Sequence, residues 1–148
     1  MKVTIAPSRA KGTVLAPPSK SMAHRMLMGA GLAEGTSVVE NIDLSEDIKA
    51  TLGMLEALGG QYKIEDRKVI MQGVGGKKLQ TKQKLNSNES GSTLRFFIPL
   101  LLSGGEKAEF TGAKRLFERP LGIYEDICKE QGILFEKSET GLKVEGQL

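Results

Sequence analysis

The sequence contains one cysteine, one histidine and no tryptophan among its 148 residues. A single cysteine, Cys128, excludes an internal disulfide and indicates a reducing compartment, so we expect a cytoplasmic protein. The longest apolar run, 96–102, is far too short to cross a bilayer and is interrupted by Pro99, and the first residues lack the apolar stretch of a secretory signal. We therefore expect no membrane partner.

The charge is also close to balanced. Lys and Arg number 21, Asp and Glu number 18, and a net charge of +3 does not by itself indicate a nucleic-acid partner. His24 has no cysteine or carboxylate cluster beside it, so we predict no metal site and expect a partly exposed helix residue. A chain of this length can form one sizeable core or an incomplete piece of something larger.

The stretch from Pro17 to Arg25 places two cations and two hydroxyls around the expected start of a helix. The two prolines block continuation of the preceding segment, and Ser19 or Ser21 is a good N-cap. Unpaired backbone N–H groups and the helix dipole make this end attractive to an anion, whereas Lys20 opposes the dipole unless an anion compensates it. The stretch predicts an anion site; the alternative is an ordinary capped helix with solvated cations.

The rest of the chain predicts an α/β arrangement that occurs twice. After the first helix come a strand, a helix capped by Ser45, and a hairpin turning at 66–67; a loop covers 73–84, and the same order then returns. Met22, Met26 and Met28 are expected in the core, and Cys128, in the middle of a helix, is expected to be packed rather than nucleophilic. The expected strands are Lys2–Ala6, Thr13–Ala16, Ser37–Ile42, Tyr62–Glu65, Val69–Gln72, Ala108–Thr111, Ile133–Lys137 and Leu142–Glu145.

An internal repeat of about 70 residues follows from this order. Arg25 and Arg95 are both five residues into their helices, and Gly35 and Gly105 fall at the same offset. We expect the two helix N-termini to converge on one site, where Gly91 would let a ligand approach the backbone closely. The alternative for the second N-terminus is a plain cap in a serine-rich turn.

The second copy contains an insertion, Lys114–Arg119, that we expect to be a loop. Pro120 suits the first position of the following helix, so Arg119 would lie just outside another helix N-terminus. A cation at that end favours anion capture. The alternative is a solvated arginine paired with Glu118.

Three motifs together resemble the successive signatures of the 5-enolpyruvylshikimate-3-phosphate (EPSP) synthase family. They are Pro17–Arg25, Asn88–Arg95 and Arg115–Gly122, in the expected order and with the expected separations. The resemblance implies a fold of βαβαββ repeats, the inside-out α/β barrel of enolpyruvyl transferases, with about two of the three repeats of the N-terminal domain. Residues 1–16 would be initial strands that pack with the C-terminal domain, and 17–148 an incomplete N-terminal domain with repeats at about 17–80 and 85–148.

The resemblance also implies an activity. The family transfers the enolpyruvyl group of phosphoenolpyruvate to the 5-hydroxyl of shikimate 3-phosphate and releases phosphate, on the pathway to chorismate and the aromatic amino acids. It uses no metal or organic cofactor. The expected partners are the two substrates and the C-terminal domain of the same enzyme, and we expect a monomer.

Residue by residue, the resemblance implies that Lys20, Ser21 and Arg25 bind shikimate 3-phosphate. Lys20, Gly91 and Arg119 would bind phosphoenolpyruvate, where the herbicide glyphosate also binds in the family. The proton-transfer groups of the family are not matched by any residue of this chain. We therefore expect the full enzyme to be active and this chain alone to be inactive.

Glu89 and Phe96 depart from the family pattern, in which many members have asparagine and proline. These departures leave the polar contacts near Gly91 and the glyphosate sensitivity open. Two other functions remain possible at this stage. One is the related enolpyruvyl transferase acting on UDP-N-acetylglucosamine, which fits poorly because it generally relies on a loop cysteine and Cys128 lies in a helix. The other is an anion-binding module without catalysis.

Overall fold

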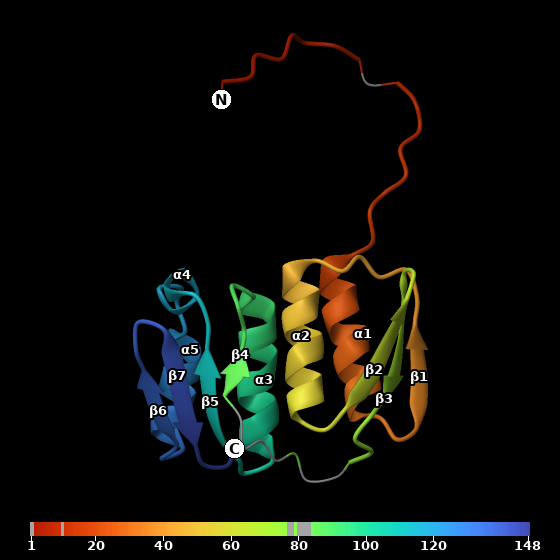
Figure 1. Ribbon diagram of the computed structural model, residues 1–148. Helices are drawn as coiled ribbons and strands as arrows, with labels where there is room; N and C mark the ends of the chain where they lie inside the picture. Colours follow the sequence, from red (N-terminus) through yellow and green to blue (C-terminus); the bar gives the residue numbers. More distant parts are fainter. Residues whose placement is uncertain (1, 10, 77–78, 80–83) are drawn as a thin grey trace.

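The computed structural model describes residues 2–9, 11–76, 79 and 84–148, and it contains two α/β units joined side by side (Figure 1). Each unit packs helices against one face of a mainly antiparallel sheet. The elements in chain order are α1 (Lys20–Leu32), β1 (Thr36–Val39), α2 (Glu46–Ala57), β2 (Gln61–Glu65), β3 (Lys68–Gln72), β4 (Leu85–Asn86), α3 (Gly91–Ser103), β5 (Lys107–Thr111), α4 (Lys114–Phe117), α5 (Gly122–Glu130), β6 (Leu134–Lys137) and β7 (Gly141–Glu145).

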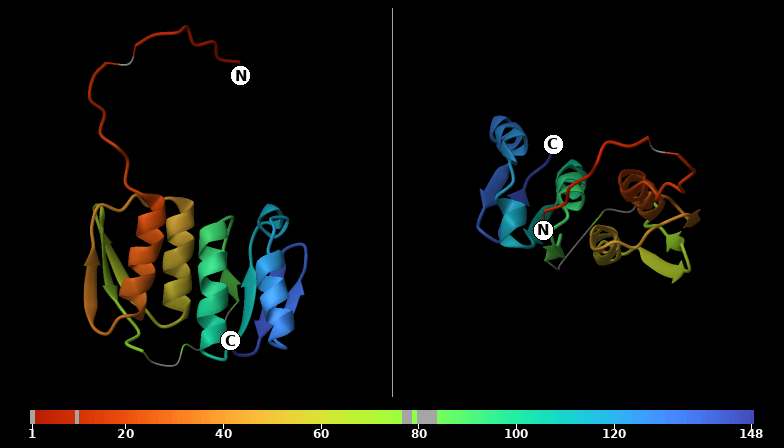
Figure 2. Two further views of the ribbon diagram at one scale, coloured as in Figure 1. Left: turned by 180° about the vertical axis from the view of Figure 1, so that it is seen from behind. Right: turned by 90° about the horizontal axis from the view of Figure 1, so that it is seen from above.

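Serine caps set the starts of the three central helices. The side chains of Ser19, Ser45 and Ser90 each accept the backbone N–H three residues further on, at 3.3, 3.4 and 3.2 Å. Such a bond satisfies one of the donors that a helix start leaves unpaired. The helices α1, α2 and α3 lie next to one another and begin at the same end of the molecule (Figures 1 and 2). Their free N–H groups therefore point toward one edge of the protein.

The two sheets confirm the internal repeat. In the first unit the strand order is β1-β3-β2, and β3 is antiparallel to both neighbours; in the second, β5-β7-β6 has the same order and the same directions. The predicted hairpin is present, with Asp66 in the left-handed region at φ +51°. Strand β4 is an addition at the edge of the second sheet, where it runs parallel to β5.

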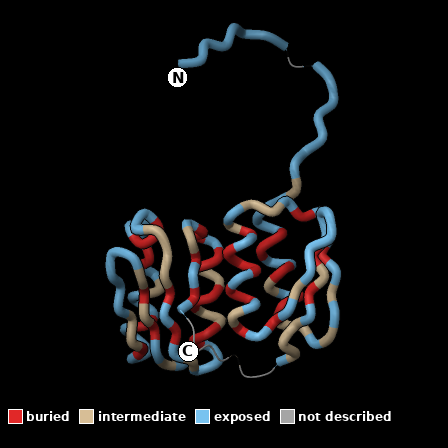
Figure 3. The backbone as a smooth tube through the Cα atoms, viewed as in Figure 1, coloured by how far each residue is buried: buried red, intermediate tan, exposed pale blue. Residues whose placement is uncertain are grey.

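The core lies between the helices and the sheets and runs through both units (Figure 3). It forms because apolar residues recur at helical spacing on the helices and alternate on the strands. Gly31 lets α1 approach α2, since a Cβ there would lie 2.6 Å from a methyl carbon of Leu55. The largest fully buried side chains are Phe97, Phe110, Leu27, Ile48, Leu52, Met54, Leu55, Met71, Leu85, Leu94, Ile98 and Leu101.

The expected strands Lys2–Ala6 and Thr13–Ala16 are not formed. The described residues before Pro17 extend away from the body of the protein, and Val14 and Leu15 are 91% and 97% exposed (Figure 1). The prediction of these two strands was wrong, because a strand needs a neighbour that supplies backbone hydrogen bonds as well as residues that favour an extended backbone. No described segment of this chain pairs with them.

The second copy differs from the expected course in its insertion. Residues 114–117 form the short helix α4 rather than a loop, and α5 begins at Gly122, two residues later than Pro120. Neither helix has a side-chain cap bond, so the signal that located the other starts is missing here.

Cys128 is buried as expected, whereas Met22 and Met26 are about half exposed rather than in the core. Residues 77–78 and 80–83 of the expected loop 73–84 lie outside the described residues.

None of the helices in the described part of the chain is both long enough and apolar enough to span a bilayer.

Candidate anion-binding site

Two arginine side chains meet over the first residue of α3. A Cβ added at Gly91 would lie 2.7 Å from Nη1 of Arg95 and 2.9 Å from Nη1 of Arg119, both closer than real Cβ contacts allow. Only glycine leaves room for both guanidinium groups at this position. The site therefore combines a helix N-terminus with two permanent cations, which is the arrangement that binds phosphate or carboxylate.

Arg95 holds the segment that carries Arg119. Its Nη1 donates to the carbonyl oxygen of Gly91 at 3.3 Å, and its Nη2 donates to the carbonyl oxygen of Pro120 at 3.0 Å. The side chain thus links the first turn of α3 to the turn between α4 and α5. Sequence comparison of the two repeats located Arg95, but its link to Pro120 depends on residues 25 positions apart and was not predicted.

A proline in α3 adds a second link to the same region. Pro99 has no N–H, so the carbonyl oxygen of Arg95 one turn earlier lacks its helical donor. The hydroxyl of Tyr124 on α5 donates to that oxygen at 3.2 Å. A buried backbone carbonyl is rarely left unpaired, and here the missing bond is replaced by one that fastens α5 to α3.

Arg119 itself is exposed. Within the described residues it makes no hydrogen bond and no ion pair, so the alternative of a pairing with Glu118 is not observed. Like charges that converge without a counter-charge repel each other. The arrangement favours an anion that would separate Arg119 from Arg95.

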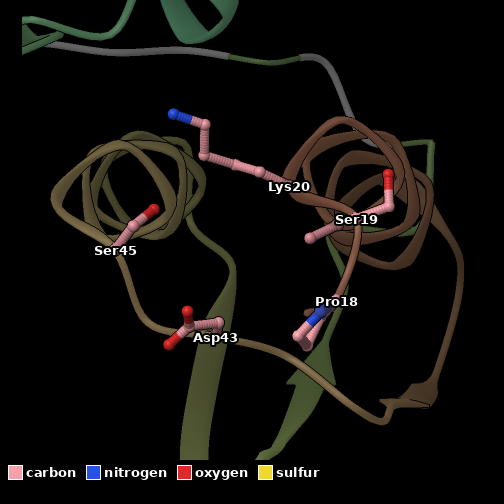
Figure 4. Close-up of a pocket in the computed structure, with 6 residues that line it drawn as sticks. Pro18, Ser19, Lys20, Asp43 and Ser45 are labelled. Carbon is pink, nitrogen blue, oxygen red and sulfur yellow. The ribbon is translucent and has the colours of Figure 1, made fainter. Parts of the chain in front are cut away.

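The second part of the site is the first turn of α1. Lys20 extends toward α2 (Figure 4). Its Nζ lies 2.5 Å from Oδ2 of Asp47, in the first turn of that helix. The two side chains are 56% and 30% exposed, so solvent screens the pair and it contributes about 0–1 kcal/mol. Next to them is a small cavity lined by Pro18, Ser19, Lys20, Ala23, Asp43 and Ser45 (Figure 4).

Arg25 connects α1 to α3. Its Nη1 donates to the backbone oxygen of Ser21 at 2.8 Å, and its guanidinium carbon lies 5.2 Å from the ring centre of Phe96. This distance is within the range of a cation–π contact. Arg25 and Ser21 are both exposed near the start of α1, so they are accessible to a ligand.

A buried polar cluster joins the three helices directly beneath this end. His24 Nδ1 lies 2.8 Å from the Thr51 hydroxyl, which lies 2.8 Å from that of Thr93, which in turn lies 2.6 Å from that of Ser90. All four residues are at most 1% exposed. The expectation that His24 is partly exposed was wrong, because its hydrogen-bond partner, Thr51, lies 27 residues away and leaves no local signal.

Burial lowers the pKa of His24 below its ordinary value of 6.5. Asp47 acts in the opposite direction, whereas Lys20 and Arg25 lower the pKa further. The net shift is downward because an imidazolium loses hydration when it is buried. Burial therefore favours the neutral form of His24.

The predicted site residues thus fall into two groups on neighbouring helix N-termini. Lys20, Ser21 and Arg25 lie on α1, and Gly91 and Arg119 meet at α3. Their chemistry suits two anionic groups, one for each helix start. Among residues 2–9, 11–76, 79 and 84–148 there is no group of three or more His, Cys, Asp or Glu that could hold a metal ion.

Three comparisons with known proteins agree with one another. A family model described as EPSP synthase (3-phosphoshikimate 1-carboxyvinyltransferase) matches residues 5–146. The 3-phosphoshikimate 1-carboxyvinyltransferase of Clostridium perfringens strain SM101 is 44% identical over 149 residues, which is 99% of this chain and 35% of the relative. That of Clostridium novyi strain NT is 40% identical over 156 residues, with 99% of this chain and 36% of the relative covered.

A solved structure of EPSP synthase from Acinetobacter baumannii matches with a TM-score of 0.79 at 25% identity. The match covers 91% of this chain and 32% of that one. The chain therefore spans about a third of the length of the proteins it resembles.

Proposed function

Since this chain belongs to the EPSP synthase family, we propose that it forms the substrate-binding part of an enzyme that transfers the enolpyruvyl group of phosphoenolpyruvate to shikimate 3-phosphate. The acceptor would be the 5-hydroxyl, and the products would be 5-enolpyruvylshikimate 3-phosphate and phosphate. The relatives carry the name of this activity over about three times the length of this chain. The activity is proposed for such a whole protein, and ligand binding without turnover for this chain.

In this proposal the two substrates occupy the two helix starts. Lys20, Ser21 and Arg25 bind shikimate 3-phosphate, and Lys20, Gly91 and Arg119 bind phosphoenolpyruvate. Both ligands are multiply charged anions, so cations must neutralise them before the reacting carbon and oxygen atoms can approach. The helix N–H groups add donors whose positions are fixed before the ligand arrives.

The observation that carries the proposal is the convergence of Arg95 and Arg119 on Gly91. Two guanidinium groups lie within 3 Å of the place where a Cβ would be, and Arg119 has no counter-charge among the described residues. Repulsion between them is a cost that a bound phosphate or carboxylate would remove. A purely structural arginine would instead be expected beside a carboxylate or at a helix C-terminus.

The remaining expectations belong to the same proposal. The whole protein would act in the cytoplasm as a monomer, with a second domain of the same enzyme as the partner that covers the site. No metal or organic cofactor would take part.

Titration of the isolated chain with phosphoenolpyruvate and with shikimate 3-phosphate tests the proposal, with heat or amide chemical shifts as the signal. Arg119→Gln is expected to weaken phosphoenolpyruvate binding, whereas the control Arg115→Gln removes an exposed charge on α4 and should leave the binding unchanged. Lys20→Ala combined with Arg25→Ala should weaken shikimate 3-phosphate binding. If neither ligand binds, or if both arginine variants behave alike, the proposed site is wrong.

A further inference from the structure

The buried polar cluster consists of His24, Thr51, Thr93 and Ser90. None of these four residues is among the proposed ligand-binding residues, yet the cluster lies directly behind both halves of the site. His24 precedes Arg25 in α1, and Ser90 precedes Gly91 at the start of α3. Thr51 on α2 stands between them. The cluster therefore connects the backbone of one half-site to the backbone of the other.

The hydrogen-bond donors and acceptors of the cluster determine which tautomer of His24 is present. Three hydroxyls and one neutral imidazole supply four N–H and O–H donors. With the imidazole proton on Nδ1, the Ser90 hydroxyl donates to Thr93, and the Thr93 hydroxyl donates to Thr51. His24 also donates to Thr51, and the Thr51 hydroxyl donates to the carbonyl oxygen of Asp47 at 3.4 Å. Every donor then has an acceptor.

The other tautomer breaks this closed arrangement. Nε2 of His24 is buried and has no hydrogen-bond partner among the described residues. An N–H at that position would be an unpaired donor in the interior, and such groups are rare in folded proteins, whereas an unpaired acceptor is better tolerated. Protonation of both nitrogens creates the same unpaired N–H.

We propose that His24 is a positioning residue of the anion site: neutral, with its proton on Nδ1, it closes a hydrogen-bond cluster that fixes the first turn of α3 against those of α1 and α2. The inference rests on the proposed function, because the groups it positions are the two halves of the proposed substrate site. His24 touches neither ligand. It acts through Thr51, Thr93 and the Ser90 cap, which holds Gly91 and its neighbouring amides in place.

The charged groups around His24 make the arrangement dependent on ligand and on pH. Asp47 faces it from α2, and Lys20 and Arg25 face it from α1, while α3 contributes only the uncharged hydroxyls and the ring of Phe96. An anion bound to Lys20 and Arg25 would remove part of the repulsion that disfavours the imidazolium. Ligand binding on α1 should therefore raise the pKa of His24.

The first test uses the fact that His24 is the only histidine in the chain. In an ¹⁵N-labelled sample the imidazole signals need no assignment, and at pH 7.5 we expect the protonated nitrogen to be Nδ1. On acidification the amide signals of Lys20, Ser21 and Gly91 should move with the imidazole, with a shared midpoint below 6.5. A proton on Nε2, or amide chemical shifts that do not change at the midpoint of the imidazole titration, would overturn the proposal.

The second test compares two substitutions at one position. Thr51→Val removes the hydroxyl that accepts from His24, and Thr51→Ser retains it. We expect the valine variant to shift the Gly91 amide and to weaken phosphoenolpyruvate binding about tenfold or more, and the serine variant to stay within about twofold of wild type. If the valine variant does not fold, Thr93→Val interrupts the cluster at its next member. Equal affinities in the hydroxyl-bearing and hydroxyl-free variants would show that the cluster is merely structural.

These tests separate the two proposals. The tautomer and the amide response are measured without ligand, so their outcome depends on the cluster and not on the proposed function. If both behave as expected and the wild-type chain binds no phosphoenolpyruvate, the proposed function fails and the positioning of Gly91 by the cluster remains.

Discussion

Replacement of Gly91 by alanine should weaken ligand binding without lowering stability. The added methyl carbon would lie 2.7 and 2.9 Å from two guanidinium nitrogens, whereas ordinary contact begins at 3.4 Å. The nitrogens of Arg95 and Arg119 must therefore retreat by about 0.7 and about 0.5 Å. Both are at the ends of flexible side chains, so the backbone of α3 need not move.

The size of the effect follows from the length of a charge-assisted hydrogen bond. Such bonds are about 2.7–2.9 Å long, and a displacement of half an ångström or more breaks one unless the ligand moves too. The loss of one bond to a charged group costs about 1.5–3 kcal/mol, or about 10- to 100-fold in affinity. Alanine is more favourable than glycine by up to about 1 kcal/mol in a helix interior. Because this gain offsets the weakened bond from Arg95 Nη1 to the carbonyl oxygen of Gly91, the melting temperature should change little.

The assay is a phosphoenolpyruvate titration combined with thermal unfolding of the same sample. Gly29→Ala is the matched control, because Gly29 is an exposed residue within α1 and a Cβ there would meet nothing within 4 Å. We expect the control to gain stability and keep its affinity, and Gly91→Ala to lose affinity. Wild-type affinity in Gly91→Ala, or an equal loss in both variants, would refute the argument from the two arginines.

Three other predictions follow from single contacts. Asp47→Asn removes the carboxylate paired with Lys20 and should raise the affinity for shikimate 3-phosphate, measured by calorimetry, up to about fivefold. An unchanged affinity would mean that the Lys20–Asp47 ion pair does not compete with the ligand. Tyr124→Phe should cost about 1 kcal/mol in urea unfolding, but less in a Pro99→Ala background, where alanine supplies the missing N–H; additive costs would contradict this. Because burial lowers the pKa of His24, the unfolded chain binds the proton more tightly. The contribution of neutral His24 to the free energy of unfolding should be complete above about pH 6.5 and should decrease as the pH falls toward the folded pKa. This pH dependence should be absent in His24→Asn, and an identical pH profile for that variant would show that His24 is not its source.

Local signals in the sequence were sufficient to locate the scaffold. Ser45 followed by acidic residues marked the start of α2, and the turn at Asp66 marked the hairpin. The equal spacing of Arg25 and Arg95 indicated the repeat that the two sheets confirm. These features depend on neighbours in the chain, and helix caps and turns are determined by such neighbours.

The parts that were missed depend on residues far apart in the chain. The burial of His24 follows from hydroxyls on two other helices, and the bond from Arg95 to Pro120 spans 25 positions. The strand predicted at Thr13–Ala16 had the right local pattern but no pairing partner in the described chain. A motif can indicate that Gly91 and Arg119 belong to one site, but their separation becomes known only when the helices are packed together.

The common direction of α1, α2 and α3 also affects how quickly a ligand arrives. Each helix carries about half a positive elementary charge at its start, and three parallel starts add to Lys20, Arg25 and Arg119 at one end of the protein. The net charge of +3 is small, and Glu46 and Asp47 in the first turn of α2 offset part of the positive charge at this end, so the field there depends on how the charges are placed rather than on their sum. A multiply charged anion would be drawn to that end before it touches any side chain, and its association rate would decrease as salt screens the field.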